Sequence, residues 1–430
     1  MASNNFLRRA LGKILSQSDQ QQPSLRQRRL FLENLEDRRL LAADLGIFPI
    51  QPAEGFQDQL DGLLAIPVFV NGVFTNGDVT DDFPYEKEHT FFLESRPGAT
   101  KTIYLDYNGH TSTNNQWTRD FGVSEIVSLP FDLDGDTSSF SDDELKRIQY
   151  HFIEVVEDYL PFDINVTTKD PGLAALTKSN PADTTWGIRS VNTNQTFGDP
   201  AGGFCYIGSF DDFEDNPCYV FFPDVWTGLI NSHEIGHSLG LYHDGLGSQV
   251  YHPGTGSGPT GWGPIMGAPS GQNLVQWSKG QYANSTNNQD DLFIITNNTN
   301  GFGYRTDDHG NSRATATALV ITNGTEVNST EVDNWGIIER TNDVDYFSFT
   351  TGAGNVALQI NPVAVRGSID VEAVLYNSSG TVIGTSNPVD EINASFTETL
   401  AKGTYFIRVD GVGKSGVYSD YGSLGYFEIT

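Results

Sequence analysis

The stretch His233-Glu-Ile-Gly-His-Ser-Leu-Gly-Leu-Tyr-His243, followed by Asp244, holds three of the eight histidines of this 430-residue chain. On a helix, residues four positions apart lie on one face, so His233 and His237 can direct their imidazole nitrogens at one point. We predict that the helix ends at Gly240, because glycine adopts the positive φ of a helix C-terminus without strain. The chain can then turn back and bring His243 to the same point.

Three neutral imidazoles leave one position of a tetrahedral metal site open. An open position is typical of catalytic zinc, because water binds there and loses a proton near neutral pH, whereas a fourth ligand closes a structural site. Glu234, next to the first histidine, points beside the metal and not onto it. The alternative is a helix with ordinary core or surface histidines, but this spacing of histidines, glutamate and glycine is rare by chance.

Met266 is the only methionine besides the initiator, and it lies in Trp262-Gly-Pro-Ile-Met-Gly267. A lone internal methionine usually fills a core. Here the surrounding glycines and proline predict a tight turn that runs beneath the metal.

HEIGHSLGLYHD followed by PIMG resembles the zinc-binding helix and the Met-turn of metzincin metallopeptidases. The residues that match the three zinc ligands of that family are His233, His237 and His243. By the same resemblance Glu234 is the general base, Gly240 the turn glycine and Met266 the Met-turn residue. Asp244 after the third histidine is typical of the adamalysin/reprolysin subgroup. Ala268 replaces the switchable tyrosine of astacins and serralysins, which favours an adamalysin-like or matrixin-like site.

The resemblance implies a secreted zinc endopeptidase that acts on proteins or peptides, with Glu234 passing the proton of the attacking water to the leaving amine. Two alternatives stay open: an inactive zincin-fold protein that serves surface binding or adhesion, and a zinc hydrolase of another bond. The enzyme is favoured because Glu234 and all three histidines are present. The sequence sets neither the substrate specificity nor the oligomeric state.

Composition limits the partners of the protein. Lys and Arg number 25 and Asp and Glu 55, a formal net charge of −30. So acidic a chain argues against nucleic acid or an anionic membrane as a partner. No run of about 18 apolar residues occurs, so we expect no stable membrane insertion. The length suffices for two folded domains, each with its own core.

Residues 1–43 form a basic N-terminal segment whose apolar runs are too short for an ordinary secretory signal. Within it, LRQRRLFLENLEDRRLLA (residues 25–42) resembles the LExLExRxLL motif that precedes many planctomycete extracellular proteins. The resemblance implies an extracellular or cell-surface protein that is trimmed near Ala42 or Ala43. The alternative is an amphipathic or disordered basic tail.

Residues 98–308 are the expected metallopeptidase domain, of α+β class, because strand, helix, strands and a metal-bearing helix follow one another. By resemblance to metzincins, this domain holds a mixed twisted sheet plus helices. The predicted strands are 101–107, 162–168 and 187–191. A Ser141/Glu144 capping box begins a helix that ends near Tyr159. Residues 44–97 are an N-terminal extension of this domain or a propeptide.

Gly203-Phe-Cys-Tyr-Ile-Gly208 is a further predicted strand, upstream of the zinc helix. Metzincins bind substrate as an added antiparallel strand on such an edge. The residues to which the resemblance therefore assigns substrate binding are Gly203, Phe204, Cys205, Tyr206 and Ile207. The alternative is an ordinary sheet strand without a ligand.

Cys205 and Cys218 are the only cysteines, and they flank an acidic turn at 211–215. One cross-strand disulfide is expected, in agreement with an oxidising compartment, and two buried free thiols are the alternative. No cysteine precedes residue 205, so latency of the matrixin type, through an N-terminal cysteine on zinc, is not expected.

Asp132, Asp134 and Asp136 offer oxygen ligands at alternate positions, as calcium prefers. The match to an EF-hand is poor, because Thr137 stands where a glycine is needed and Asp143 where a bidentate glutamate is usual. Calcium is therefore a second candidate cofactor here, against a solvated acidic loop that leads into a helix.

Residues 309–430 begin in an Asn/Gly-rich stretch of the kind found in linkers. Alternating strands separated by turn residues then predict an antiparallel β-sandwich, at 344–349, 356–360, 371–376, 403–409 and 425–430. The segments 343–349 and 403–409 resemble the bacterial pre-peptidase C-terminal domain, which is often appended to secreted peptidases. Their aromatic residues are expected in the core.

Overall fold

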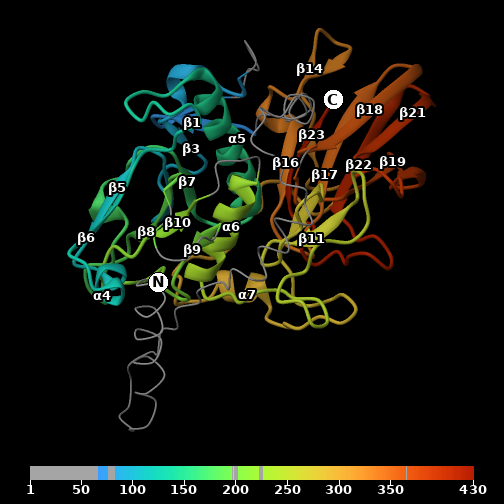
Figure 1. Ribbon diagram of the computed structural model, residues 1–430. Helices are drawn as coiled ribbons and strands as arrows, with labels where there is room; N and C mark the ends of the chain where they lie inside the picture. The colour runs from blue at the N-terminus through green and yellow to red at the C-terminus, as the bar shows by residue number, and fades with distance from the viewer. Residues whose placement is uncertain (1–65, 76–82, 196, 198–201, 222–225, 365) are drawn as a thin grey trace.

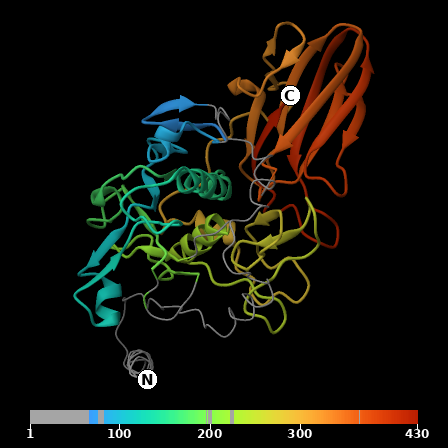
Figure 2. The same cartoon turned by 45° about the horizontal axis from the view of Figure 1, so that its top comes forward.

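The computed structural model describes residues 66–75, 83–195, 197, 202–221, 226–364 and 366–430. Within them the chain is rich in β-strands and has few helices. One part, here called the mixed-sheet unit, combines a large sheet with the helices, and a C-terminal β-sandwich lies beside it (Figures 1 and 2). The expected basic segment at 1–43 and the trimming point near Ala42 lie outside the described residues.

The mixed-sheet unit is built on eight strands in the order β2-β1-β3-β7-β4-β8-β10-β9. The neighbours of β4 and β8 in the centre run parallel, and β4 is buried along its whole length, as expected for strands that are covered on both faces. The strands are β1 (Val68–Val70), β2 (Val73–Thr75), β3 (Leu93–Glu94), β4 (Lys101–Asp106), β7 (Asn165–Thr167), β8 (Trp186–Asn192), β9 (Gly203–Phe204) and β10 (Cys218–Val220).

The strands described between residues 66 and 75 and at 93–94 belong to this sheet. β1 pairs with β3, and β3 pairs in turn with β7 through Glu94 and Thr167. The described part of the predicted extension or propeptide therefore adds strands to the sheet.

Two long helices pack against each other beside the sheet, α5 (Asp142–Tyr159) and α6 (Thr227–Ser238). The predicted capping box begins α5: the Ser141 hydroxyl accepts the N–H of Glu144, and the Glu144 carboxylate accepts the N–H of Ser141. The shorter elements of the unit are α4 (Gln116–Phe121), α7 (Asp291–Ile295), η1 (Lys87–His89), η2 (Leu173–Ala175), β5 (His110–Thr113), β6 (Glu125–Ser128), β11 (Trp262–Pro264) and β12 (Leu274–Gln276).

The strand predicted at 162–168 is shorter in the structure, where β7 covers only Asn165–Thr167. Phe162 instead forms an isolated antiparallel bridge with Tyr304, and both rings pack together with centroids 5.6 Å apart. The alternating pattern was read as one strand because the distant partner of Phe162 is not visible in the local sequence.

The C-terminal sandwich consists of two sheets, and all five predicted strands are present. One sheet contains β13 (Thr317–Ala318), β17 (Asp345–Thr351), β22 (Gly403–Gly411), β19 (Val371–Asn377) and β20 (Val382–Ser386) in this order. The other contains β16 (Trp335–Ile338), β23 (Gly425–Ile429), β18 (Gly354–Pro362) and β21 (Ala394–Leu400). A small hairpin, β14 (Ile321–Thr322) with β15 (Glu326–Val327), and η3 (Val332–Asn334) complete it.

One hydrophobic core runs through both parts of the molecule. The same cluster of buried residues holds Ile153 of α5 and Met266 of the mixed-sheet unit, and also Ile360 and Phe427 of the sandwich. Polar contacts cross the same boundary: the Gln276 side chain donates to the Ser368 carbonyl at 2.8 Å. The sandwich is therefore packed onto the mixed-sheet unit and is not merely tethered to it.

Candidate metal centre

His233 and His237 lie on α6 and are both buried. The Nδ1 atom of each ring forms a hydrogen bond with a backbone carbonyl: His233 Nδ1 lies 2.9 Å from Ile265 O, and His237 Nδ1 lies 2.8 Å from Leu241 O. A carbonyl can only accept, so Nδ1 carries the proton and Nε2 the lone pair in both rings. This is the tautomer that a metal ligand requires.

Gly240 follows the end of α6 and has a φ of 108°, the positive value predicted for it. The N–H of Leu241 donates to Gly236 O at 3.1 Å and that of Gly240 to His237 O at 2.9 Å, so the turn satisfies helix carbonyls that lack intrahelical partners. His243 is thereby returned to the helix face, where its Nε2 lies 3.0 Å from the Nε2 of His237.

One nitrogen from each of His233, His237 and His243 lies within 4.8 Å of the others. Three nitrogens bound to zinc at about 2.0–2.1 Å would lie roughly 3.3 Å apart, which is close to the separation found between His237 and His243. The geometry and the tautomers of the three side chains therefore fit a divalent metal of the zinc type.

Met266 lies directly beneath this site. Its side chain is fully buried, and a Cβ added to Gly236 of α6 would lie 2.5 Å from its sulfur. The Met266 carbonyl accepts the N–H of Asp244 at 2.8 Å, and the preceding carbonyl, of Ile265, holds His233. Burial raises the pKa of Asp244 to about 7, with a side-chain hydrogen bond from Asn287 acting in the opposite direction. The turn thus supports the first and third histidines together.

Glu234 is buried on the side of α6 that faces β9. A Cβ added to Gly203 would lie 2.5 Å from Glu234 Oε1, so only glycine fits between the sheet edge and this carboxylate. β9 is the last strand of the sheet and runs antiparallel to β10. The structure therefore brings the predicted edge strand and the predicted general base into contact.

The strand predicted at 203–208 is nevertheless wrong in its length, because β9 contains only Gly203 and Phe204. Beyond Phe204 the chain runs to the end of α6, where the N–H of Gly208 donates to His237 O at 2.9 Å and that of Phe210 to Ser238 O at 3.0 Å. Cys205, Tyr206 and Ile207 are buried and lie outside the two-residue strand β9.

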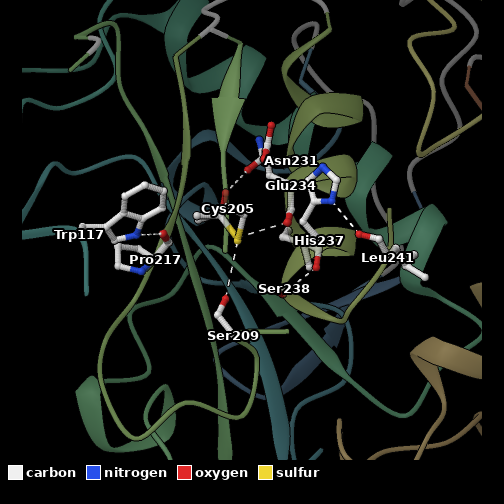
Figure 3. The surroundings of a disulfide bond; sticks show 12 residues. Trp117, Cys205, Ser209, Pro217, Asn231, Glu234, His237, Ser238 and Leu241 are labelled. Atoms are coloured by element: carbon white, nitrogen blue, oxygen red, sulfur yellow. Dashed lines mark hydrogen bonds between the residues drawn. A yellow bond between two sulfur atoms is a disulfide. The ribbon is translucent and has the colours of Figure 1, made fainter. Parts of the chain in front are cut away.

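Cys205 and Cys218 form a disulfide, which joins the end of β9 to β10. Figure 3 shows this bond beside the backbone of α6, where the Cys218 sulfur lies 3.5 Å from the Glu234 carbonyl oxygen. The disulfide therefore closes the segment 205–218 immediately next to the candidate general base.

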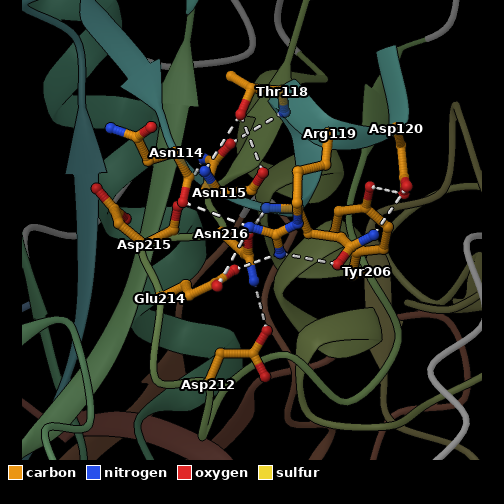
Figure 4. Close-up of polar contacts among 11 residues, drawn as sticks. Asn114, Asn115, Thr118, Arg119, Asp120, Tyr206, Asp212, Glu214, Asp215 and Asn216 are labelled. Carbon is orange, nitrogen blue, oxygen red and sulfur yellow. Dashed lines mark hydrogen bonds and ion pairs between the residues drawn. The ribbon is translucent and has the colours of Figure 1, made fainter. Parts of the chain in front are cut away.

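The segment between the cysteines is anchored on α4 (Figure 4). Arg119 pairs with Glu214 at 2.6 Å, and the Tyr206 hydroxyl donates to Asp120 at 2.6 Å. A capping box of Asn115 and Thr118 begins α4, and the Asn115 side chain also donates to Asp215 O at 2.7 Å. These contacts make Tyr206 a structural residue of this corner.

The acidic loop at 132–136 satisfies its carboxylates largely with its own backbone. Asp132 Oδ1 accepts the N–H groups of Asp134 and Gly135, and Asp134 Oδ1 accepts that of Asp136. The third carboxylate near Asp132 and Asp134 is that of Glu144. Both oxygens of Glu144 accept backbone N–H groups. Calcium at this loop stays a prediction beside the solvated-loop alternative, and the ligand atoms that lie together belong to Asp132, Asp134 and Glu144.

A second group of carboxylates, which the sequence did not reveal, lies where the sandwich begins. Asp307 is shared between two triads in which the carboxylate oxygens lie within 4.8 Å of one another: Asp307, Asp308 and Glu339, and Asp307, Asp343 and Asp345. Both oxygens of the buried Asp345 lack hydrogen-bond partners within the described chain, and the buried Glu339 lies beside the carboxyl of Asp343, with which it can share a proton. Burial raises the pKa of Glu339 to about 11 and that of Asp345 to about 10, and repulsion from Asp308 adds to this effect. Unpartnered buried carboxylates require a compensating cation or a proton.

In comparisons with known proteins, the family described as planctomycete extracellular matches residues 26–45. The protein carries the export motif of that family and is an exported protein. No curated protein matches the chain. Within the described residues, no helix has both the length and the apolar character needed to cross a bilayer.

Two solved structures show weak likeness. The pre-peptidase C-terminal domain of a Bacillus anthracis collagenase is 12% identical and covers 22% of this chain and 85% of its own, with a TM-score of 0.17. PliG, a periplasmic inhibitor of g-type lysozyme from Aeromonas hydrophila, is 12% identical and covers 27% of this chain and 96% of its own, with a TM-score of 0.18. Neither likeness carries an argument about function.

Proposed function

We propose that the protein is a secreted zinc endopeptidase of metzincin type whose catalytic centre consists of His233, His237, His243 and Glu234. The observation that carries the proposal is the convergence of three imidazole nitrogens within 4.8 Å, next to a buried carboxylate on the same helix. Met266 beneath the helix and Asp244 after the third histidine support it, because both hold the ligand-bearing backbone.

When bound, zinc supplies Lewis acidity toward a carbonyl oxygen and lowers the pKa of water. Glu234 accepts the proton of the attacking water and delivers it to the leaving amine. Its neighbour Gly203 lies on the sheet edge, so an extended peptide that adds to β9 as a further strand passes beside Glu234. We assign substrate binding to Gly203 and Phe204 and no longer to Cys205, Tyr206 and Ile207.

This proposal makes the mixed-sheet unit the peptidase domain, with the strands from residue 66 onward included. The sandwich is proposed to be a pre-peptidase C-terminal-like domain. An inactive adhesion protein is the rival function, and it predicts that the zinc-loaded protein releases no new amino termini from any protein mixture.

Two substitutions test the catalytic assignment. Glu234→Gln should retain about one zinc per chain and lower kcat/KM by at least about 100-fold, because it removes only the proton acceptor. His237→Ala should lose the metal as well. Metal content by mass spectrometry and release of amino termini, inhibited by a chelator and restored by zinc, measure both effects.

Glu88→Gln is the matched control, because Glu88 is an exposed glutamate of the same unit outside the candidate centre. It should leave metal content and turnover unchanged. Undiminished turnover in Glu234→Gln would remove Glu234 from the role of general base.

We propose calcium as a second cofactor, held by the carboxylates at the start of the sandwich. Hard oxygen ligands in this number suit calcium, and the buried carboxylates of Glu339 and Asp345 would be stabilised by a divalent cation. Calcium should raise the melting temperature, since an ion that binds only the folded chain stabilises it. Asp345→Asn should abolish the increase and Asp132→Asn should not. An equal response of both variants and the wild type would contradict this assignment.

A further inference from the structure

The helix that carries His233, Glu234 and His237 begins without a side-chain cap from its N-cap residue. Its N-cap residue is Trp226, which makes no side-chain capping hydrogen bond, and the first turn holds no acidic residue. The first N–H groups of a helix lack intrahelical partners and carry a partial positive charge. An acceptor from another part of the chain can therefore stabilise the start of α6.

The carboxylate of Glu154 of α5 lies against this first turn. A Cβ added to Gly228 would lie 1.8 Å from Glu154 Oε2, so the carboxylate is packed against the first turn of α6. Burial raises the pKa of Glu154, while the charge of Arg366 and the backbone N–H of Leu229 act in the opposite direction. A buried carboxylate in contact with a helix N-terminus is stabilising only while its charge is compensated.

Arg366, which belongs to the sandwich, supplies the compensating charge. Its guanidinium forms an ion pair with Glu154 Oε1, and its central carbon lies 4.2 Å from the centroid of the Trp226 ring. The side chain is only 6% exposed. Arg366 also has a φ of 53°, which residues other than glycine rarely adopt. Such a conformation persists only where the surrounding contacts hold it.

The same loop of the sandwich makes a second connection to α6 through α5. The Ser368 hydroxyl donates to Asp158 at 3.1 Å, and the Ser368 N–H donates to Glu157 at 3.3 Å. The next residue of α5, Tyr159, donates its hydroxyl hydrogen to the carbonyl of Ser232 at 3.0 Å. Ser232 immediately precedes His233. The loop is thus linked to the start of α6 and to the turn that carries the first histidine.

We propose that Arg366 of the sandwich is a positioning residue of the metal centre: it holds Glu154 at the N-terminus of α6 and so fixes the helix that presents His233, Glu234 and His237. The proposal rests on the zinc site proposed above. If it is correct, the C-terminal sandwich is a permanent part of the peptidase. Separating the sandwich from the mixed-sheet unit would then weaken metal binding. Glu154 and Arg366 lie at the first turn of α6 and act on the metal centre through this helix.

The test uses the full chain with Arg366→Met, which keeps much of the apolar stem and removes the charge. Zinc affinity is measured by competition with a chromogenic chelator, and kcat and KM with a peptide substrate. We expect zinc affinity to fall by about 10- to 100-fold, the usual effect of losing a residue that holds the ligands from outside the site. Arg408→Met is the matched control, because Arg408 pairs with Glu372 within the sandwich, and it should change zinc affinity less than about twofold.

Rescue separates positioning from a general loss of folding. In Glu154→Gln/Arg366→Met the amide still accepts a hydrogen bond from the helix but leaves no unpaired charge, so zinc affinity should recover toward that of the wild type. Arg366→Lys, which restores the charge without the planar contact to Trp226, should lie between the wild type and Arg366→Met.

Unchanged zinc affinity in a folded Arg366→Met protein would overturn the proposal, and so would a double variant as weak as the single one. If Arg366→Met does not fold, the double variant and Arg366→Lys decide by the same measurement. Zinc that binds the wild type without any peptide hydrolysis would refute the proposed function but leave this test intact, because its first readout is metal affinity.

Discussion

Two glycines leave space for the groups that matter most in the candidate centre. Gly203 faces the carboxylate of Glu234 across the sheet edge, and Gly236 faces the sulfur of Met266 on the other side of α6. Neither position has the positive φ that would by itself demand glycine. Both glycines are therefore explained by close approach to a side chain, not by backbone conformation.

Gly203→Ala should consequently displace Glu234 while leaving the three histidines in place. We expect zinc content to remain at the wild-type level and kcat to fall by roughly 10- to 100-fold, since small displacements of reacting groups cost that much. Steady-state kinetics with metal analysis checks this. Gly303→Ala is the control, because no atom lies within 4 Å of a Cβ there, and equal kinetics of both variants would contradict the role of Gly203.

The candidate centre could be predicted from the sequence as far as its residues are local. His233, His237, Gly240 and His243 lie within one helix and one turn, so their spacing implies their geometry. The contact of Glu154 with Arg366 joins residues separated by 212 positions, and no local pattern indicates it. The carboxylates at the start of the sandwich were not predicted for the same reason, although the acidic residues within 307–308 and within 343–345 lie close together in the sequence and could have indicated them.

At the level of elements, the disulfide closes a segment with little regular structure. Cys205 and Cys218 are separated by 13 positions, and between them the chain caps the end of α6 and contacts α4. β9 has only two residues, so its own hydrogen bonds to β10 hold the edge weakly. The covalent link therefore contributes strongly to keeping the edge beside Glu234.

Replacing both cysteines by alanine should lower the free energy of unfolding by about 3 kcal/mol, as expected for a closed loop of this length. KM for a peptide substrate should rise more than kcat falls, because the edge strand that binds the substrate loosens. Denaturant unfolding and steady-state kinetics measure the two effects. A variant as stable as the wild type, with unchanged KM, would show that the segment is held without the disulfide.

On the scale of the whole molecule, the junction between the two parts contains buried acids. Glu157 of α5 is fully buried there and accepts the N–H groups of Ser368 and Tyr426 from the sandwich. Glu154 and Asp158 lie on the same helix, and Arg366 faces Glu154. Burial raises the pKa of Glu157 to about 8 from its ordinary value of 4.5.

This pKa predicts that the protein becomes less stable as the pH rises. Between about pH 4.5 and pH 8 the folded chain keeps a proton on Glu157 that the unfolded chain has lost, so stability is full at low pH and declines through this window. One such group contributes a slope of up to about 1.4 kcal/mol per pH unit. Urea unfolding at several pH values should show a shallower decline for Glu157→Gln. Parallel curves for the variant and the wild type would exclude Glu157 as the cause.

The predicted sandwich strands agree with the structure because alternation of inward and outward residues is a local property. The strands at 345–351 and 403–411 follow this pattern closely. Strand order and the docking of the sandwich on α5 depend on contacts between distant residues, and the sequence did not indicate them. Residues 66–97 were hard to place for a similar reason, since their short strands gain order only by joining a larger sheet.

The hydrophobic cluster that contains residues of both the mixed-sheet unit and the sandwich bears on how such chains can diversify. Gene recombination that exchanged the C-terminal part for an unrelated module would leave the outer face of α5 without a complementary surface. Viable change at this boundary therefore requires compensating substitutions on both sides. Related chains should show covariation between position 154 and position 366 and inherit the two parts together.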